Sequence, residues 1–264
     1  MTNFAFETLG VTRHGRVAVI SLHRPAAMNA INMQMRAELR QALGELRQDS
    51  AIGAAVLTGG GDKAFCAGLD LREFAQLNAD VPVAEMKRLR WEQSEGIANF
   101  DKPILAAING LAIGGGVELA LLCDLVFAAD NASFAFAEIK RGLMPGNGGT
   151  QRLSRRIGVP RALDMILTGR TVDAQEALAL GLVEYVVPAA ELLHRALALA
   201  EQMAANASVA VRTAKAAVRR GAEMALEDGI RMEQDLASFL YTTDDAKEGP
   251  QAFLEKRVPR WQGR

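Results

Sequence analysis

The sequence is poor in the residues that build disulfide frameworks and metal sites. Its 264 residues include two cysteines, Cys66 and Cys123, and three histidines, His14, His23 and His194. Two cysteines make neither a disulfide framework nor a zinc site, and the histidines lack the spacing of metal ligands. We therefore expect no metal centre, a reducing compartment, and cysteines that act as small core residues.

A dominant charge and a long apolar run are missing as well. The 30 Lys and Arg residues nearly balance the 31 Asp and Glu residues, so the net charge is −1 and neither nucleic acid nor a membrane surface is an expected partner. The longest apolar region, 104–129, contains Glu118 and Asp124, which argues against a membrane span. The first residues show no basic segment followed by an apolar one, so we expect no secretory signal and a cytoplasmic location.

Up to about residue 188, the chain alternates between strand and helix patterns. Between Met35 and Leu46, apolar residues recur at intervals of four, three and four, which predicts a helix between two apolar strands. Strand, helix and strand in succession imply a parallel crossover, so the expected fold class is α/β. The expected strands lie at 16–22, 54–58, 104–108, 125–129, 133–136 and 182–187.

The last quarter of the chain is helical in pattern throughout. We place residues 1–194 in a core that holds the active site and residues 195–264 in a helical subdomain. Several helices in a row need a partner surface, so we expect the chain to associate with copies of itself. The expected helices lie at 192–203, 208–220 and 224–241, with a final one from Asp244 through Leu254.

The most informative stretch joins a strand, a glycine turn and a helix. The apolar run at 104–108 leads to Gly114–Gly116, and a helical run containing Glu118 follows. Backbone N–H groups at a helix start favour negative charge, and glycine lets a ligand approach the backbone closely. Glu118 is a carboxylate in an otherwise apolar segment, so its neighbours satisfy it or it is used chemically. The alternative is a tight turn with an acid suited to a helix N-terminus.

A second turn and a second carboxylate make a chemical role more specific. Gly68 precedes Leu69 and can present the Leu69 N–H outward, with a plain bend as the alternative. If this turn faces Gly115, two N–H groups converge to form an oxyanion hole. Glu138 lies 20 residues after Glu118, where an extended segment becomes an irregular loop, and a solvated loop acid is its alternative. An oxyanion hole, two carboxylates and no nucleophile suggest enolate chemistry with acid–base help.

Motifs of one family are spread along nearly the whole chain. They are His23–Pro25 with Asn29–Ala30, Ala64–Asp70, Asn109–Glu118, Glu138 with Pro145–Leu153, Asp244–Gly249 and Ala252–Arg257. Together they resemble the crotonase superfamily, and enoyl-CoA hydratase most closely. The resemblance implies an α/β fold built as a crotonase-like spiral of ββα units. It also implies a C-terminal helical oligomerisation subdomain that forms trimers, often paired into hexamers.

The resemblance further implies a reaction. A 2-enoyl-CoA hydratase adds water reversibly to trans-2-enoyl-CoA and gives 3-hydroxyacyl-CoA. The N–H groups of Leu69 and Gly115 would bind the thioester oxygen. Glu118 would help to activate the water that attacks C3, and Glu138 would donate the proton to C2. Because CoA is part of the substrate, no separate cofactor is implied.

The resemblance also implies where the CoA portion is held. Arg24 is expected at a phosphate, and Phe253 and Lys256 are expected to reach the CoA of a neighbouring subunit. The full expected set of substrate and CoA contacts is Arg24, Ala64, Ala67, Leu69, Asp70, Leu71, Gly115, Phe253 and Lys256.

Two other functions stay open. Enoyl-CoA isomerases and other enolate-forming crotonases can use a glutamate at the second position alone, whereas having both Glu118 and Glu138 favours hydration. A few relatives of the hydratases bind RNA, and a basic stripe on one predicted helix keeps that function open, although a solvated helix face is the more ordinary interpretation. The stripe consists of Arg212, Lys215, Arg219 and Arg220.

Two further expectations concern Asp124 and the walls of the acyl pocket. Asp124 is expected to cap or form a salt bridge at the start of the strand at 125–129. The walls of the acyl pocket are expected from residues 72–100, which include a charged helical segment over 83–99 with Trp91, and from residues 139–147.

Overall fold

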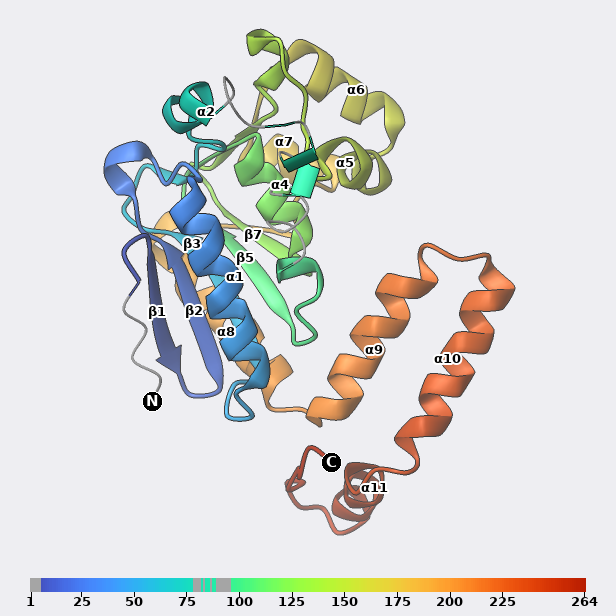
Figure 1. Cartoon of the computed structure of the whole chain (residues 1–264). Helices are drawn as coiled ribbons and strands as arrows, with labels where there is room; N and C mark the ends of the chain where they lie inside the picture. The colour runs from blue at the N-terminus through green and yellow to red at the C-terminus, as the bar shows by residue number, and fades with distance from the viewer. Residues whose placement is uncertain (1–5, 78–81, 83, 86, 89–95) are drawn as a thin grey trace.

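The computed structural model describes residues 6–77, 82, 84–85, 87–88 and 96–264. Two β-sheets with their helices form a core, and three helices at the C-terminal end extend from it (Figure 1). Of the helix expected over 83–99, every described residue before Asn99 is helical, and Trp91 lies outside the described residues. No helix in the described part of the chain is both long and apolar enough to cross a membrane.

The larger sheet has six strands in the order β1-β2-β3-β5-β7-β10. β1 and β2 form an antiparallel hairpin, and the other neighbours are parallel, as the strand–helix–strand pattern predicts. The first four predicted strands are confirmed. They could be predicted because short apolar runs are typical of parallel strands buried on both faces. The prediction missed β1, and the last strand begins at Tyr185 instead of residue 182. The bounds are β1 Leu9–His14, β2 Val17–Leu22, β3 Ala54–Gly59, β5 Ile104–Ile108, β7 Leu125–Ala129 and β10 Tyr185–Val187.

The smaller sheet has four strands of three residues each, in the order β4-β6-β8-β9. Only β8 was predicted, because three residues are too few to show an alternating pattern. β4 and β6 are parallel neighbours, so their carboxyl ends deliver two glycine turns to the same edge of the sheet. The bounds are β4 Ala64–Cys66, β6 Leu111–Ile113, β8 Ser133–Ala135 and β9 Thr171–Asp173.

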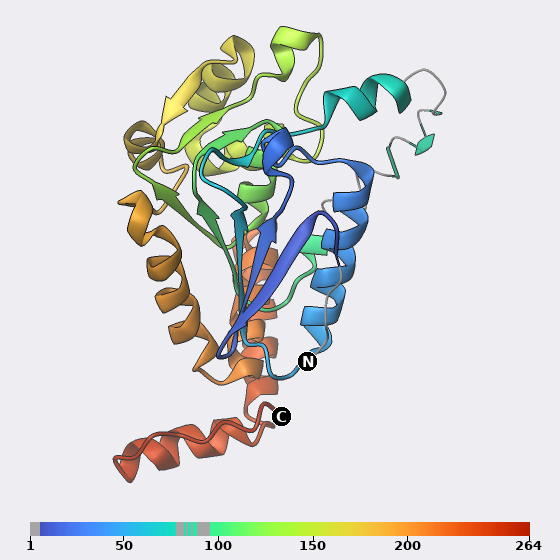
Figure 2. The same cartoon turned by 90° about the vertical axis from the view of Figure 1, so that its left-hand side faces the viewer.

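Helices cover both faces of the larger sheet. Figure 2 shows α1 on one side of this sheet and α8 on the other. The Asn32 side chain accepts a hydrogen bond from the Met35 N–H and so caps α1, whose face from Met35 to Leu46 is buried as its spacing predicts. The bounds in the core are η1 Pro25–Ala27, α1 Met33–Gln48, α2 Leu71–Leu77, α4 Gly115–Leu122, η2 Glu138–Arg141, α5 Gly149–Ile157, α6 Val159–Thr168, α7 Ala174–Leu180, η3 Ala189–Glu191 and α8 Leu192–Ala204.

The C-terminal helices divide into one that belongs to the core and three that leave it. α8 packs on β2, β3, β5 and β7, and it buries Ala196, Ala200 and Ala204 against them. The division expected between residues 194 and 195 therefore falls inside a helix of the core. The extending helices are α9 Ser208–Gly221, α10 Leu226–Leu240 and α11 Asp245–Leu254 (Figure 1).

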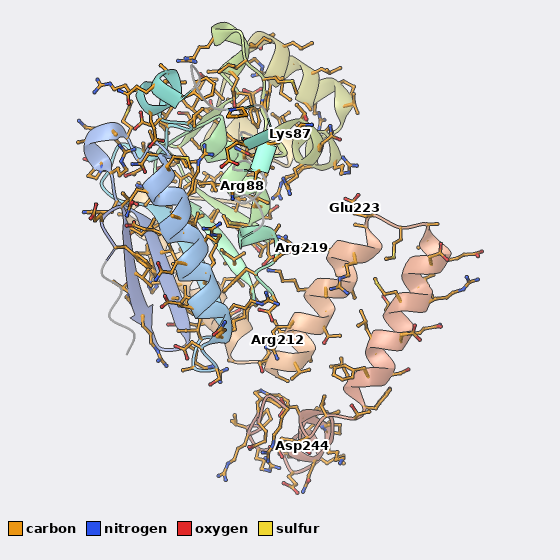
Figure 3. The ribbon with its side chains drawn as sticks, in the orientation of Figure 1. Lys87, Arg88, Arg212, Arg219, Glu223 and Asp244 are labelled. Carbon is orange, nitrogen blue, oxygen red and sulfur yellow. The ribbon has the colours of Figure 1, made fainter. Side chains whose placement is uncertain are left out.

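Ion pairs tie α9 back to the core. Asp124 accepts hydrogen bonds from Lys215 Nζ at 2.7 Å and from the Ile104 N–H at 2.8 Å, and it pairs with Arg219 at 2.8 Å. Asp124 thus has the capping and salt-bridging role that was predicted. Arg219 also donates to the Leu122 carbonyl at the end of α4, and Figure 3 shows its side chain extending from α9. The interpretation of the basic stripe as a solvated face was wrong for Lys215 and Arg219, because the half-buried carboxylate of Asp124 holds both.

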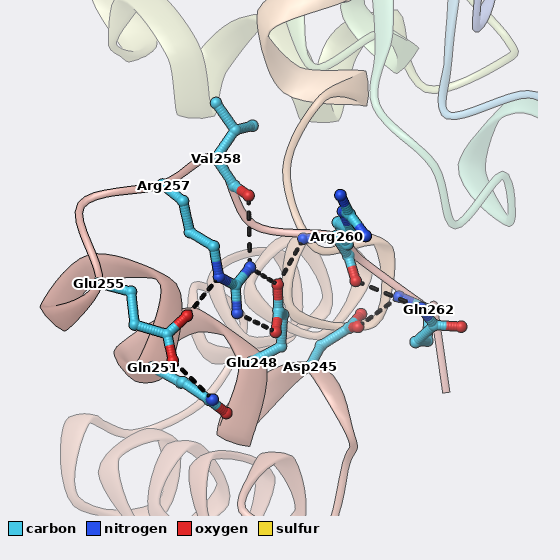
Figure 4. Close-up of polar contacts among 8 residues, drawn as sticks. All are labelled: Asp245, Glu248, Gln251, Glu255, Arg257, Val258, Arg260 and Gln262. Atoms are coloured by element: carbon cyan, nitrogen blue, oxygen red, sulfur yellow. Dashed lines mark hydrogen bonds and ion pairs between the residues drawn. The ribbon is translucent and has the colours of Figure 1, made fainter.

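The final residues fold back on α11 through charged hydrogen bonds (Figure 4). Arg257 donates to both carboxylate oxygens of Glu248, at 2.6 and 2.9 Å. This pairing lowers the pKa of Glu248 to about 2. The N–H groups of Gln262 and Gly263 donate to Asp245 at 2.6 and 3.0 Å. The tail is therefore anchored to carboxylates in the first turn of α11, which also meet the positive end of the helix dipole.

Candidate functional site

The two glycine turns meet at the edge of the smaller sheet. Gly68 follows β4 with φ +89°, and Gly114 follows β6 with φ +51°, both in the region that favours glycine. A Cβ on Gly68 would lie 2.7 Å from the Ile113 carbonyl oxygen and 3.3 Å from the Gly115 nitrogen. Glycine is needed here because the two backbones approach too closely for a side chain.

Two backbone N–H groups, those of Leu69 and Gly115, have no acceptor among the described residues where the glycine turns meet. A parallel bridge joins Ile31 to Leu69 through the Gly68 carbonyl and the Asp70 N–H, so it leaves the N–H of Leu69 itself unused. Gly115 is the first residue of α4, where a helix has no internal acceptor for its N–H groups. Within the described residues, neither N–H has a hydrogen-bond acceptor. The predicted pair, Leu69 and Gly115, is brought together beside one cavity.

Glu118 is buried in the first turn of α4, only 3% exposed. Its Oε1 accepts hydrogen bonds from the N–H groups of Asn147 and Gly149, at 2.7 and 2.8 Å. A buried carboxylate needs such donors, since an unpaired charge in the interior is very costly. The irregular loop before α5 therefore holds this side chain in one place.

Glu138 opens the 3-10 turn η2 at the same cavity, in a different environment. Burial raises the pKa of its carboxyl to about 7, and the negative charge of Glu118 acts in the same direction. Its Oε2 is buried and has no hydrogen-bond partner among the described residues. Glu138 can therefore hold a proton near neutral pH and has an oxygen free to exchange it.

The cavity has a volume of about 750 Å³, a size typical of small-molecule sites. Part of its wall is apolar and is formed by Met33, Phe74, Leu143 and Met144. It opens beside both glutamates and both glycine turns. The predicted site residues that line it are Arg24, Ala67, Leu69, Asp70, Leu71, Gly115, Glu118 and Glu138.

Arg24 lies at this cavity but already has partners. It forms a salt bridge with Asp70 at 3.0 Å and donates to the Ala30 carbonyl at 2.6 Å. Burial alone would raise the pKa of Asp70, but the hydrogen bond from Arg24 and the N–H groups of Arg72 and Glu73 lower it. This arrangement fixes Arg24 beside the turn that carries Leu69.

Three predicted contacts do not line the cavity of their own chain. Ala64 is buried, and its carbonyl accepts from Asn29 Nδ2 at 2.8 Å. Phe253, 83% exposed, lies on α11, and Lys256 is exposed just beyond it.

The sequence prediction missed Asn147 and Gly149 as the donors to Glu118. The glycine-rich loop at 145–149 was the available signal. Among the described residues, no group of three or more His, Cys, Asp or Glu side chains could hold a metal ion.

Comparison with known structures defines the class of fold. The crystal structure of an enoyl-CoA hydratase from Bacillus anthracis matches with a TM-score of 0.92 and 39% identity, over 98% of this chain and 100% of that one. The chain therefore has the crotonase fold, which confirms the predicted α/β class.

Sequence comparison then gives the family. A family model described as enoyl-CoA hydratase/isomerase matches residues 12–264, and the chain belongs to this family. It is 46% identical over 257 residues to a probable enoyl-CoA hydratase of Mycobacterium bovis, covering 97% of this chain and 98% of that protein. It is 42% identical over 254 residues to the 2,3-dehydroadipyl-CoA hydratase of Escherichia coli, covering 96% and 98%.

Proposed function

We propose that this chain is a 2-enoyl-CoA hydratase that adds water across the C2–C3 double bond of a trans-2-enoyl thioester and gives the 3-hydroxyacyl-CoA. The observation that carries the proposal is a pair of carboxylates, Glu118 and Glu138, held in unlike states at one cavity beside two unpaired N–H groups. Family membership and relatives described as hydratases support it.

Charge on the thioester is handled by the backbone. Attack at C3 moves an electron pair through C2 onto the thioester oxygen. The N–H groups of Leu69 and Gly115 would receive that oxygen, and the amino end of α4 favours its negative charge. Loss of one oxyanion donor typically costs about 3 kcal/mol of barrier.

The protons are handled by the glutamates. Glu118, oriented by two amide donors, would accept a proton from the water as its oxygen bonds to C3. Glu138, which holds a proton near neutral pH, would deliver it to C2 as the enolate collapses. The product gains one water, and the proton left on Glu118 must be returned to Glu138 or solvent before the next turnover.

The test is direct. Purified protein is mixed with crotonyl-CoA, and the loss of the conjugated enoyl-thioester absorbance is followed. Mass spectrometry then gives the mass of the product. We expect a gain of one water. A panel with longer, branched and dicarboxylic acyl groups then defines the substrate, since the Escherichia coli relative is described as a 2,3-dehydroadipyl-CoA hydratase. No water addition to any member would contradict the proposal.

Isomerisation of 3-enoyl-CoA is the second candidate. The observation that favours it is the free Oε2 of Glu138, which could move a proton between two carbons of one substrate without Glu118. A 3-enoyl-CoA substrate and the Glu118→Gln variant separate the two reactions, because only isomerisation would survive in that variant. RNA binding is supported less, because Asp124 holds Lys215 and Arg219.

We also propose that the chain forms trimers, or pairs of trimers, through its last three helices. α9 and α10 bury no residue within this chain. Large apolar side chains are exposed on α10 and α11, and such surfaces mark interfaces. In a trimer, Phe253 and Lys256 could reach the CoA of a neighbour. Light scattering coupled to gel filtration measures the assembly. The exposed apolar residues are Leu226, Ile230, Phe239, Phe253 and Leu254.

A further inference from the structure

The loop that holds Glu118 is itself held by a cation. Asn147 donates its N–H to Glu118 Oε1 at 2.7 Å, and its carbonyl accepts from Arg152 Nη1 at 3.0 Å. Arg152 lies on α5, and its own N–H donates to the Gly148 carbonyl at 2.8 Å. One residue of α5 thus holds the loop at two points, next to both N–H groups that orient Glu118.

The fit of this side chain against the loop is close. A Cβ on Gly148 would lie 1.7 Å from Arg152 Nη1, so the guanidinium occupies the space that a side chain at 148 would need. Arg152 is half-buried. Among the described residues, its guanidinium forms no salt bridge with a carboxylate. Its contact with Glu118 is therefore indirect, through the backbone of Asn147.

The charge of Arg152 also acts on this region. Burial lowers the pKa of its guanidinium, and the negative charge of Glu118 opposes that shift, so the two groups lie in each other's field. Arg219 of α9 and Glu223, in the turn after α9, also act on Arg152 and carry opposite charges. Glu138 is the other titratable group that faces Glu118.

We propose that Arg152 is a positioning residue for Glu118: its guanidinium holds the Asn147 peptide whose N–H orients the carboxylate that accepts a proton from water. The inference rests on the proposed hydratase function. It concerns a residue that is not among those lining the cavity.

The first test compares three variants on crotonyl-CoA. Arg152→Gln removes the charge and the fork of donors, and we expect kcat to fall about 10- to 100-fold with KM changed less than about threefold, because misplacement of a reacting group costs rate more than binding. Arg152→Lys keeps the charge and one donor and should recover part of the rate. Arg155→Gln, an exposed change on the same helix, is the matched control and should match the parent.

Two readouts separate positioning from a purely structural role: a fall in kcat without a matching change in KM, and coupling to Glu118. In the Glu118→Gln background, Arg152→Gln should lower kcat less than about threefold further, because residues that act through each other are not additive.

The outcomes distinguish the inference from the function on which it rests. If the parent hydrates no enoyl-CoA, the proposed function fails. If the parent is active and Arg152→Gln keeps kcat, or if its effect adds fully to that of Glu118→Gln, the positioning role is wrong. Circular dichroism and binding of butyryl-CoA check folding. If Arg152→Gln does not fold, Arg152→Lys carries the same two readouts.

Discussion

The first turn of α4 and the turn η2 each place a glutamate at the same cavity, but in opposite surroundings. At α4, Glu118 is buried but accepts two backbone N–H bonds. At η2, Glu138 has a buried oxygen with no partner among the described residues, and its pKa is raised to about 7. Hydrogen-bond donors around a carboxylate, more than its depth of burial, therefore determine whether it is held in place or free to exchange a proton. A reaction that needs a base and an acid at once gains both from one residue type.

The largest effect is expected when each carboxylate is removed in turn. We expect Glu118→Gln and Glu138→Gln each to lower kcat for crotonyl-CoA about 1,000-fold, since acid–base groups commonly contribute about 10²–10⁴. Steady-state kinetics measure the loss, and Arg155→Gln serves as the unaffected control. Full activity in either variant removes that residue from the mechanism.

A smaller effect should follow when Glu118 is displaced without being removed. A Cβ on Gly149 would lie 2.7 Å from the Phe136 ring, 2.8 Å from Pro145 and 2.9 Å from Glu118 Oε1. Gly149→Ala should therefore lower kcat about 100-fold, and circular dichroism checks that the variant is folded. Gly44→Ala is the matched control, because its Cβ would meet nothing within 4 Å. Equal activity of the two variants would contradict a fixed Glu118.

The raised pKa of Glu138 should also affect the free energy of unfolding. Its pKa is raised from 4.5 to about 7, so the folded state binds more protons than the unfolded chain between these values. Stability contributed by this group is therefore present below pH 4.5 and lost as the pH rises toward about 7. Allowing for partial exposure, we expect Glu138→Gln to be more stable than the parent by about 1–2 kcal/mol at pH 8.

Urea unfolding at pH 4.5 and pH 8 measures this difference. The gain should shrink toward zero at the lower pH, where both side chains are neutral. The same gain at both values would mean that it comes from packing and not from the charge of Glu138.

The smallest effect is expected from a change of charge near Glu138, in the turn η2. The positive charge of Arg141 opposes the rise in the pKa of Glu138. Arg141→Gln should therefore raise that pKa further and move the alkaline limb of the kcat profile to higher pH, by less than about half a unit because Arg141 is exposed to solvent. Arg161→Gln, an exposed change on α6, should leave the limb in place. A shift to lower pH would reverse the assigned sign.

Local pattern was a reliable guide where elements are long. The helix from Met35 to Leu46 and the apolar strands of the larger sheet were predicted because periodicity over several residues carries the signal. The hairpin strand β1 was missed, and so were the three-residue strands β4, β6 and β9. The basic stripe of α9 was misjudged, because nothing local indicates that Asp124, 91 residues before Lys215, lies against it.

The residues that carry the chemistry could be read from the sequence: two glycine turns, two glutamates and the motifs of the family. The different surroundings of the two glutamates could be learned from the folded chain alone. The parallel pairing of β4 with β6 brings Gly68 to Gly115, and the loop before α5 gives Glu118 the donors that Glu138 lacks. The physical reason is that residue type fixes which protons a group can exchange, whereas its surroundings, contributed from distant segments, set the pKa at which it does so.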